Sequence, residues 1–449
     1  MKLKFGDVYL LLKGKIEPYL GSDTKGRIAK GAIWGTVGTV ATRSITILLS
    51  FILARILGKD GFGEYGIITS TAAMIGGFAG LGLGSTVTRY VANLKVREPE
   101  RAGKIIGLSS LITWFSAAIY GAVFIYFAPW LAQKTLAAPH LAPMLQISSI
   151  TIGLGVVNSV QVSTLTGLES FKVSSILSTI FGIVQSVLAV LLAWHNGVKG
   201  AVIALALTSG LSVVTYYFIS RKELNNTQIH VTFTEAWNEW RVLVQYSLPA
   251  FLSTITVGPA IWASNAFLAN QHDGYGQLGI YNAAQQWHTF IQFFPALVST
   301  AVLPVMSDLY GQGDKEGSIN LMWKMMKITA ILVIPLAILV SLLSPLIIKG
   351  YGSTFAGGQW VIVIVVFTTV LSSISAHLGT LIAAAGKMWI GFAINFAWGS
   401  VFIILSNFFV KYGAEGLASA KFIAYFLHLI WSLTICILIN KQIAKDMRT

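Results

Sequence analysis

Residues 60–67 read Asp-Gly-Phe-Gly-Glu-Tyr-Gly-Ile, and residues 273–280 repeat the pattern as Asp-Gly-Tyr-Gly-Gln-Leu-Gly-Ile. Further along, Asn-Gly-Val-Lys-Gly at residues 196–200 matches Tyr-Gly-Ala-Glu-Gly at residues 412–416 with nearly the same spacing. Glycines at matched positions over an almost constant spacing indicate an internal duplication. The sequence therefore predicts two homologous halves, each carrying one copy of both segments.

The composition around these repeats is typical of a membrane protein. Of the 449 residues, 55% are hydrophobic and only 11% are charged, whereas soluble domains carry about 25% charged residues. Apolar stretches follow one another to the C-terminus, and each has the length of a membrane helix, about 20 residues. Strands are excluded because these runs do not alternate and are longer than barrel strands of about 10 residues. We expect twelve helices, near residues 31–57, 64–92, 104–129, 141–166, 173–194, 199–220, 242–270, 277–307, 318–346, 358–385, 388–410 and 416–440.

The repeats and the helices together predict an all-α polytopic membrane fold of two six-helix halves. Since six crossings return the chain to the side where it started, both halves enter from the same side. A pseudo-twofold axis along the membrane normal should then relate them, with a central cavity between them, as in transporters that work by alternating access. The expected divisions are an N-terminal basic segment 1–30, a first half 31–220, a linker 221–241, a second half 242–440 and a tail 441–449. The basic segment fits a helix on the membrane surface or a basic tail equally well.

Positive charges predict the orientation. Lys and Arg number 31 against 17 Asp and Glu, which gives a net charge of +14. Most of them fall at the N-terminus, in the even-numbered connections and at the C-terminus, so both termini, the linker and the tail should be cytoplasmic. Most of the net positive charge is therefore explained by the orientation of the protein in the membrane. It predicts anionic membrane lipids as partners, and it requires no nucleic-acid partner. The basic residues expected on the opposite side are Arg55, Lys59, Lys134, Lys199, Lys349 and Lys411.

One arginine lies where a membrane helix should be apolar. Arg43 is about 18 Å from either end of the first predicted helix at 1.5 Å per residue, and a central arginine costs at least ~2.5 kcal/mol. Thr36, Thr39, Arg43, Thr46 and Ser50 share one face of that helix. A guanidinium can donate two parallel hydrogen bonds to a phosphate. The stripe therefore predicts a cavity wall that binds an anion, with an interhelical structural role for Arg43 as the alternative.

Two further cations and one dipeptide are candidate functional positions. Lys421 lies in the twelfth predicted helix, and Arg89 lies near the end of the second. Each of them faces either the cavity or a membrane interface. Gly258-Pro259 interrupts the seventh predicted helix; it is a candidate hinge for rocking the second half, or a static kink.

The eighth predicted helix is rich in amides. Asn282, Gln285, Gln286 and Gln292 suit sugar hydroxyls, because amides both donate and accept hydrogen bonds; amide-mediated helix packing is the alternative. No predicted membrane centre carries a carboxylate, which disfavours a cation-coupled exporter. The spacing of His, Cys, Asp and Glu offers no metal-ligand set and no nucleophile with a nearby base. We therefore expect no catalytic residue, metal or cofactor.

The motifs resemble a known family. Leu-Ala-Arg-Ile-Leu-Gly at residues 53–58 runs into the 62–66 turn, and Gly-Leu-Gly-Leu-Gly-Ser at 80–85 is followed by Arg-Tyr at 89–90. With two six-helix halves over residues 28–440, the chain resembles the polysaccharide-transporter branch of the multidrug/oligosaccharidyl-lipid/polysaccharide exporter superfamily, which contains O-antigen flippases. The resemblance implies a non-enzymatic flippase of the bacterial cytoplasmic (inner) membrane. It would move an undecaprenyl-diphosphate-linked oligosaccharide, such as an O-antigen repeat unit, through a basic cavity. Arg43, Arg89 and Lys421 are where the charges of such a cavity would lie.

Two other functions stay open at this point. One is a cation-coupled small-molecule exporter of the same superfamily, and the other is a membrane-embedded glycan polymerase or ligase. The polymerase or ligase would need a large external loop with catalytic residues, whereas the predicted external connections are short. The resemblance also makes other polysaccharide-assembly membrane proteins candidate partners, beside the lipid-linked glycan itself.

Overall fold

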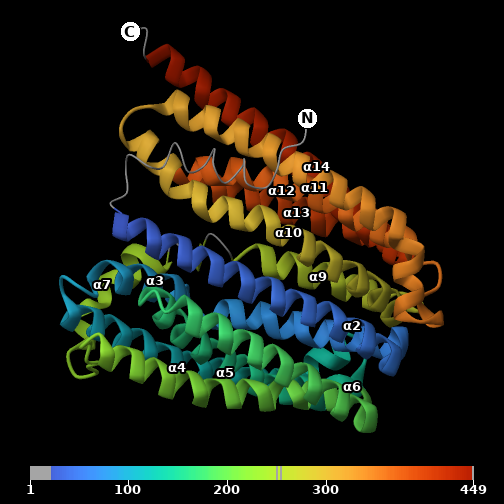
Figure 1. Cartoon of the computed structure of the whole chain (residues 1–449). Helices are drawn as coiled ribbons and strands as arrows, with labels where there is room; N and C mark the ends of the chain where they lie inside the picture. The colour runs from blue at the N-terminus through green and yellow to red at the C-terminus, as the bar shows by residue number, and fades with distance from the viewer. Residues whose placement is uncertain (1–21, 249–250, 253–254, 447–449) are drawn as a thin grey trace.

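The computed structural model describes residues 22–248, 251–252 and 255–446. These residues form helices joined by short turns, and no strand occurs among them (Figure 1). Most of the predicted basic segment 1–30, with its surface helix or tail, lies outside the described residues. The main helices are α2 (Ser22–Ala79), α3 (Leu83–Leu94), α4 (Pro99–Trp130), α5 (Ala142–Gly167), α6 (Phe171–Asn226), α7 (Trp240–Val242), α9 (Val257–Ala269), α10 (Gly274–Gly311), α11 (Lys315–Tyr351), α12 (Gln359–Ala384), α13 (Met388–Phe409) and α14 (Gly413–Asp446).

Two of these helices each contain two membrane crossings. Gly58, with φ 68° and ψ 179°, divides α2 into two arms. Asn196 and Gly197 divide α6 in the same way, Gly197 having φ 54°. Glycine adopts such positive φ values without steric cost. When the two arms of each helix are counted separately, each of the twelve predicted membrane helices has a counterpart in the structure. Among the described residues, seven uninterrupted helical runs, some of which contain two crossings, are long and apolar enough to span a membrane.

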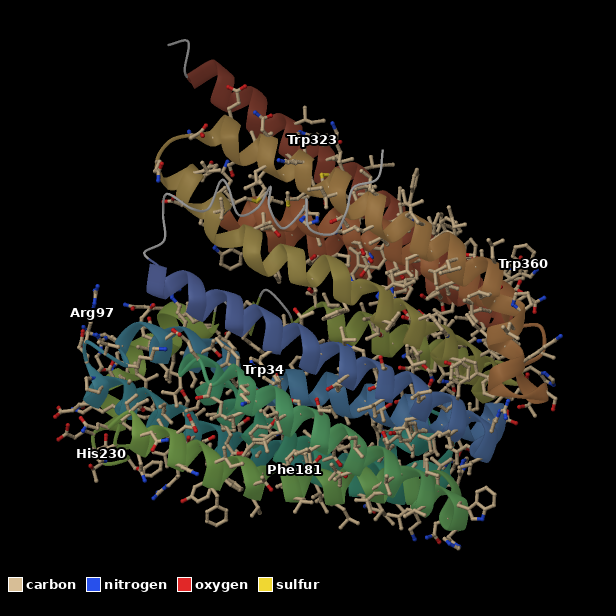
Figure 2. All side chains as sticks on the ribbon, viewed as in Figure 1. Trp34, Arg97, Phe181, His230, Trp323 and Trp360 are labelled. Atoms are coloured by element: carbon tan, nitrogen blue, oxygen red, sulfur yellow. The ribbon has the colours of Figure 1, made fainter. Side chains whose placement is uncertain are left out.

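The crossings form two lobes of six. The N-lobe comprises α2 to α6, and the C-lobe comprises α9 to α14, coloured blue to green and yellow to red in Figure 1. In the N-lobe α2 and α5 pack against α6, and in the C-lobe α10, α11 and α14 pack around α12. Large apolar side chains cover the outer surface, among them Trp323 and Trp360 (Figure 2). Such a surface is expected for helices surrounded by lipid.

The two copies of the repeated turn contact each other across the lobes. A methyl group added at Gly63 would lie 1.9 Å from the carbonyl oxygen of Tyr275, and one added at Gly279 would lie 2.0 Å from that of Lys59. Lys59 Nζ donates to Asp273 Oδ2 at 2.6 Å beside these glycines. Because matching segments of the two lobes touch, the pseudo-twofold axis passes between them. We call these five residues the repeat-turn contact.

At the other end of the lobes, the chain after α6 lies along α4. α6 continues through Asn226 into the predicted linker 221–241. Beyond it, the backbone approaches so closely that a methyl group at Gly103 would lie 2.0 Å from the carbonyl oxygen of His230. The glycine in α4 therefore makes the groove in which the linker lies.

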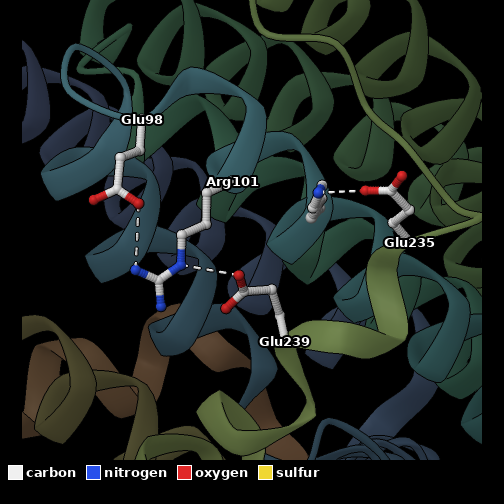
Figure 3. Close-up of polar contacts among 5 residues, drawn as sticks. Glu98, Arg101, Glu235 and Glu239 are labelled. Carbon is white, nitrogen blue, oxygen red and sulfur yellow. Dashed lines mark hydrogen bonds and ion pairs between the residues drawn. The ribbon is translucent and has the colours of Figure 1, made fainter.

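Ion pairs fasten the same linker to the N-lobe (Figure 3). Arg101 donates from Nε to Glu239 at 2.9 Å and also pairs with Glu98 at 3.4 Å. Lys104 pairs with Glu235, and the hydrogen bond from Lys104 lowers the pKa of Glu235. The Glu235 carboxylate therefore stays charged at neutral pH, and the pair ties the linker to the N-lobe.

The second predicted helix, 64–92, is not continuous. α2 ends at Ala79 and α3 begins at Leu83, because Leu81 and Gly82 adopt positive φ values of 48° and 69°. Ser116 of α4 donates its hydroxyl to the carbonyl oxygen of Ala79 at 2.6 Å, which satisfies an acceptor that the broken helix leaves free. The glycine motif that carried the family resemblance is therefore a helix break.

The seventh predicted helix, 242–270, is also interrupted. Residues 255–256 form a turn, and α9 begins at Val257. Pro259 thus occupies the first turn of α9, where its missing N–H removes no helical hydrogen bond. A methyl group at Gly258 would lie 3.8 Å from Cα of Met74 in the N-lobe. The candidate hinge therefore lies at the start of a helix and at a contact between the lobes.

Candidate functional site

A cavity of about 420 Å³ lies between the first arm of α2 and the middle of α10. Arg43 is on its wall, and among the described residues no hydrogen bond or ion pair engages this guanidinium. A cation inside a membrane protein is costly unless water or an anion solvates it. The cavity therefore contains an unpaired positive charge with five donors. Its lining residues are Thr39, Arg43, His288, Thr289, Gln292, Phe293 and Ala296.

The hydroxyls of the polar stripe on α2 are mostly used within the helix. Thr39 donates to Gly35 at 2.7 Å and Thr46 donates to Thr42 at 2.9 Å, in both cases to the backbone carbonyl one turn back. With their protons engaged, these oxygens remain able to accept. Arg43 is consequently the strong donor on this side of the cavity.

The α10 side of the cavity is polar and uncharged at its centre. His288 shares a hydrogen bond of 2.7 Å between its Nδ1 and Oγ1 of Thr369 on α12. Thr289 donates its hydroxyl to the carbonyl of Gln285 at 3.0 Å, and Gln292 presents an amide. No acidic residue is among the lining residues that the structure describes. The arrangement suits a ligand with one anionic group and several hydroxyls.

The remaining amides of α10 face elsewhere. Gln285 accepts a hydrogen bond from Lys421 Nζ at 3.0 Å, and Lys421 is only 5% exposed within the C-lobe. Asn282 lies against Gly66, where a methyl group would meet its Nδ2 at 1.7 Å. Gln286 is half-buried and is not on the cavity wall. Of the four predicted amides, the structure therefore brings Gln292 alone to the cavity with Arg43.

Arg89 is on α3 and is exposed, away from the cavity wall. Its guanidinium lies 4.5 Å from the ring centroid of Tyr246, in a cation–π contact. Next to it, the hydroxyls of Thr86 and Ser247 are 2.7 Å apart and hydrogen-bonded. These contacts join α3 of the N-lobe to the segment that begins the second half.

His288, Thr289 and Phe293 also line the cavity and are not among the candidate residues from the sequence. Together with Gln292 they occupy neighbouring positions on one face of α10. This spacing is the feature of the sequence that would have identified them as cavity residues. Within the described residues, no group of three or more His, Cys, Asp or Glu side chains could hold a metal ion.

Comparison with known proteins gives the family. Residues 28–310 match the model of a family described as polysaccharide biosynthesis protein. This chain belongs to that family. The match covers the N-lobe from residue 28 onward, the linker and the start of the C-lobe. It includes both copies of the repeated turn and the cavity-lining parts of α2 and α10.

Individual relatives extend over most of the chain. The EPS I polysaccharide export inner membrane protein EpsE of Ralstonia nicotianae is 26% identical over 412 residues, covering 88% of this chain and 90% of that protein. The lipid III flippase of Escherichia coli is 22% identical over 293 residues, covering 64% and 69% of the two chains. Among solved structures, the lipid II flippase MurJ in an inward closed conformation superposes with a TM-score of 0.72 at 16% identity, over 90% of this chain and 87% of that one. This likeness confirms the two-lobe membrane fold.

Proposed function

We propose that the protein is a flippase, not an enzyme, and that it moves an undecaprenyl-diphosphate-linked oligosaccharide across the bacterial inner membrane. The observation that carries the proposal is the unpaired Arg43 on the wall of the cavity between the lobes. Family membership and relatives named as a polysaccharide exporter and a lipid III flippase support it. The diphosphate provides the anion for the guanidinium, and the glycan provides hydroxyls for the polar α10 wall.

The orientation belongs to the same proposal. The distribution of Lys and Arg supports cytoplasmic termini and a cytoplasmic linker 221–241. With that orientation the repeat-turn contact lies at the outer end, where it closes the path. The headgroup enters from the cytoplasmic leaflet, and its diphosphate receives two parallel hydrogen bonds from Arg43. Separation of the repeat-turn contact then releases the headgroup to the outer leaflet.

Of the two alternative functions, the cation-coupled exporter fits the fold better than the polymerase or ligase does. A transported or coupling cation in a membrane interior is ordinarily bound by a carboxylate. The described cavity wall presents an arginine instead. The cavity therefore suits an anion better than a cation.

Deletion of the gene tests the proposed function. Cells lacking the flippase should accumulate an intact lipid-linked repeat unit that reagents added outside the cell cannot reach. Mass spectrometry of the extracted lipids measures the intermediate, and labelling of intact cells measures its accessibility. A chemically incomplete intermediate would instead indicate an enzyme, and a complete, outwardly accessible one would refute the flippase.

Substitution of Arg43 tests the site. Arg43→Ala should lower flipping roughly ten- to hundredfold, because a hydrogen bond to a charged group contributes about 1.5–3 kcal/mol. Arg43→Lys should restore part of the activity, since it keeps the charge and loses the planar fork. Arg97→Ala, which removes an exposed arginine outside the cavity, is the matched control and should flip normally. Wild-type flipping by Arg43→Ala at equal membrane abundance would remove Arg43 from the site.

A further inference from the structure

The linker between the two halves presents exposed aromatic side chains at the end of the N-lobe where α7 lies (Figure 1). Trp237 is 68% exposed, and Phe233 and Trp240 are each 47% exposed. A contiguous exposed apolar surface marks a contact with another molecule or with a membrane. The proposed transport cycle gives these side chains no role.

The exposed side of this segment divides into an apolar and a polar stripe. Residues 236–248 form one run of helical turns, which comprises η4 (Ala236–Glu239), α7 (Trp240–Val242), η5 (Leu243–Ser247) and Leu248. The apolar stripe has the helical spacing of three and four residues and consists of Trp237, Trp240, Val244 and Leu248. The polar stripe has the same spacing one residue later and consists of Asn238, Arg241 and Gln245, all exposed. Adjacent apolar and polar stripes are typical of a helix that lies in a lipid–water interface.

The side of the run opposite these stripes is packed against the N-lobe. Ala236, Val242 and Ser247 are buried. Ala236 lies near Gly107 of α4, and Ser247 is hydrogen-bonded to Thr86 of α3. The two stripes are therefore what this segment leaves free for its surroundings.

The position of the linker along α4 places the apolar stripe at the edge of the lipid-covered surface. The carbonyl oxygen of Thr232 lies against Gly107, where an added methyl group would be 2.2 Å away. Leu111, the first large apolar side chain of α4 that is exposed, is about 6 Å further along this helix at 1.5 Å per residue. At the other end of the stripe, Val244 and Leu248 belong to the first turns of the seventh predicted membrane helix. The stripe is thus continuous with the apolar outer surface of the lobes.

The charges beside the stripe favour a membrane surface. The acidic residues of this segment pair with cations of α4, Glu235 with Lys104 and Glu239 with Arg101 (Figure 3). Their negative charge is therefore compensated where it would otherwise repel anionic headgroups. Arg241 is exposed, and within the described residues no ion pair engages it. A basic residue at this position is attracted to anionic lipids.

We propose that the apolar stripe, together with Phe233, is a membrane anchor that inserts among the lipid headgroups and upper acyl chains at this end of the lobes. The polar stripe then faces water. Lipid covers the surface rather than a protein, because the stripe continues the lipid-covered surface and because tryptophan gathers at membrane interfaces. The anchor holds the connection between the two halves at a fixed depth. It goes beyond the flippase function and does not depend on what the protein transports.

Nitroxide labels on single cysteines test the anchor in the full-length protein, reconstituted into vesicles of phosphatidylcholine and phosphatidylglycerol. Oxygen concentrates among acyl chains and a nickel chelate stays in water, so the ratio of their collision rates with the label reports its immersion. The ratio should be roughly threefold or more higher for Trp237→Cys than for its neighbour Asn238→Cys, and likewise for Trp240→Cys against Arg241→Cys. Cys436 is buried and should not be labelled.

A third pair and two references make the comparison independent of the tryptophans. Val244→Cys against Gln245→Cys repeats it with both tryptophans in place, and the label at Val244 should again be the more immersed. Phe115→Cys on the exposed apolar face of α4 gives the value for lipid. Arg97→Cys, in the turn before α4, gives the value for water.

Two results would overturn the anchor. If the labels at Trp237, Trp240 and Val244 all give the value found at Arg97, the stripe faces water. If these labels are shielded from both reagents, protein covers the stripe, either a second copy or another part of the chain. Neither result bears on flipping, which the gene deletion tests separately.

Discussion

The same two helices, α2 and α10, meet in opposite ways at two places. At the repeat-turn contact, Gly63 and Gly279 bring backbone against backbone with no room for a methyl group. Farther along the pair, Arg43 and Gln292 stand on the walls of a cavity of about 420 Å³. Close approach through glycine stabilises helix packing in lipid through van der Waals contact. The close packing at the repeat-turn contact therefore requires glycine at these positions, whereas ligand binding in the cavity requires particular polar side chains.

This difference gives the two regions different sensitivities. A substitution at the repeat-turn contact should change the balance between closed and open lobes, whatever the substrate. A substitution in the cavity should change transport and leave that balance as it was. Substitutions in either region therefore test this separation.

The largest effect is expected from Gly63→Ala or Gly279→Ala. The added methyl group would overlap a backbone carbonyl oxygen, at 1.9 Å from Tyr275 or 2.0 Å from Lys59. Overpacking costs about 1–3 kcal/mol, so the ratio of closed to open lobes should fall roughly five- to hundredfold. Gly76→Ala on the same helix, where nothing lies within 4 Å of the added methyl group, is the control.

Distances between spin labels on the two lobes measure this balance. Labels at Lys134→Cys and Lys411→Cys report on it, because both positions are exposed and belong to different lobes. Cys436, the chain's one cysteine, is buried and should not react. A longer distance for both glycine variants and an unchanged one for Gly76→Ala would confirm the role of the contact. If Gly63→Ala gives the wild-type distance distribution, the glycines are not what closes the lobes.

A smaller effect is expected at the cavity from Gln292→Leu. Losing one neutral hydrogen bond costs about 0.5–1.5 kcal/mol, so flipping should fall roughly two- to tenfold while the spin-label distance stays constant. Gln286→Leu makes the same change on α10 away from the cavity wall and should flip normally. Equal loss in both variants would show that the amides act through helix packing and not through the substrate.

Sequence alone predicted the architecture well, for physical reasons. Lipid imposes long apolar helices, and the repeated glycines record a duplication, so the two six-helix lobes could be predicted. The position of Arg43 on a cavity wall could be predicted, because an arginine in mid-membrane must face water or a partner. The amides could not be sorted in the same way. Gln285 and Gln292 have the same side chain, so both are equally suited to bind a sugar. Only the folded structure shows that Lys421, from a helix distant in the sequence, donates a hydrogen bond to Gln285 and holds it inside the C-lobe.

The helix breaks were harder to foresee. A Gly-Leu-Gly sequence is tolerated within membrane helices, so the break at residues 80–82 depends on Ser116 being present to bond the freed carbonyl.

The smallest effect is expected from the ion pair beside the glycines. Burial alone would raise the pKa of Asp273, but hydrogen bonds from Lys59 and Gln277 outweigh it, so the pKa lies below its ordinary value. A carboxylate with a lowered pKa stabilises the closed contact above the ordinary carboxyl pKa, about 4, and this stabilisation is lost as the pH falls through the lowered pKa. Partly exposed pairs contribute about 0.2–1 kcal/mol. Asp273→Asn should therefore lower the ratio of closed to open lobes by at most about fivefold.

The spin-label distance, followed as the pH is lowered from neutral through the lowered pKa of Asp273, checks this prediction. The wild-type protein should be more closed than Asp273→Asn at neutral pH and should approach the variant in acid, where the carboxylate becomes protonated. Asp60→Asn is the matched control from the first copy of the repeat, since no ion pair engages Asp60 among the described residues. High salt should narrow the neutral-pH difference, because the pair is partly exposed to solvent. If Asp273→Asn matches the wild-type protein at neutral pH and low salt, the glycines alone maintain the closed contact, and the ion pair contributes nothing to it.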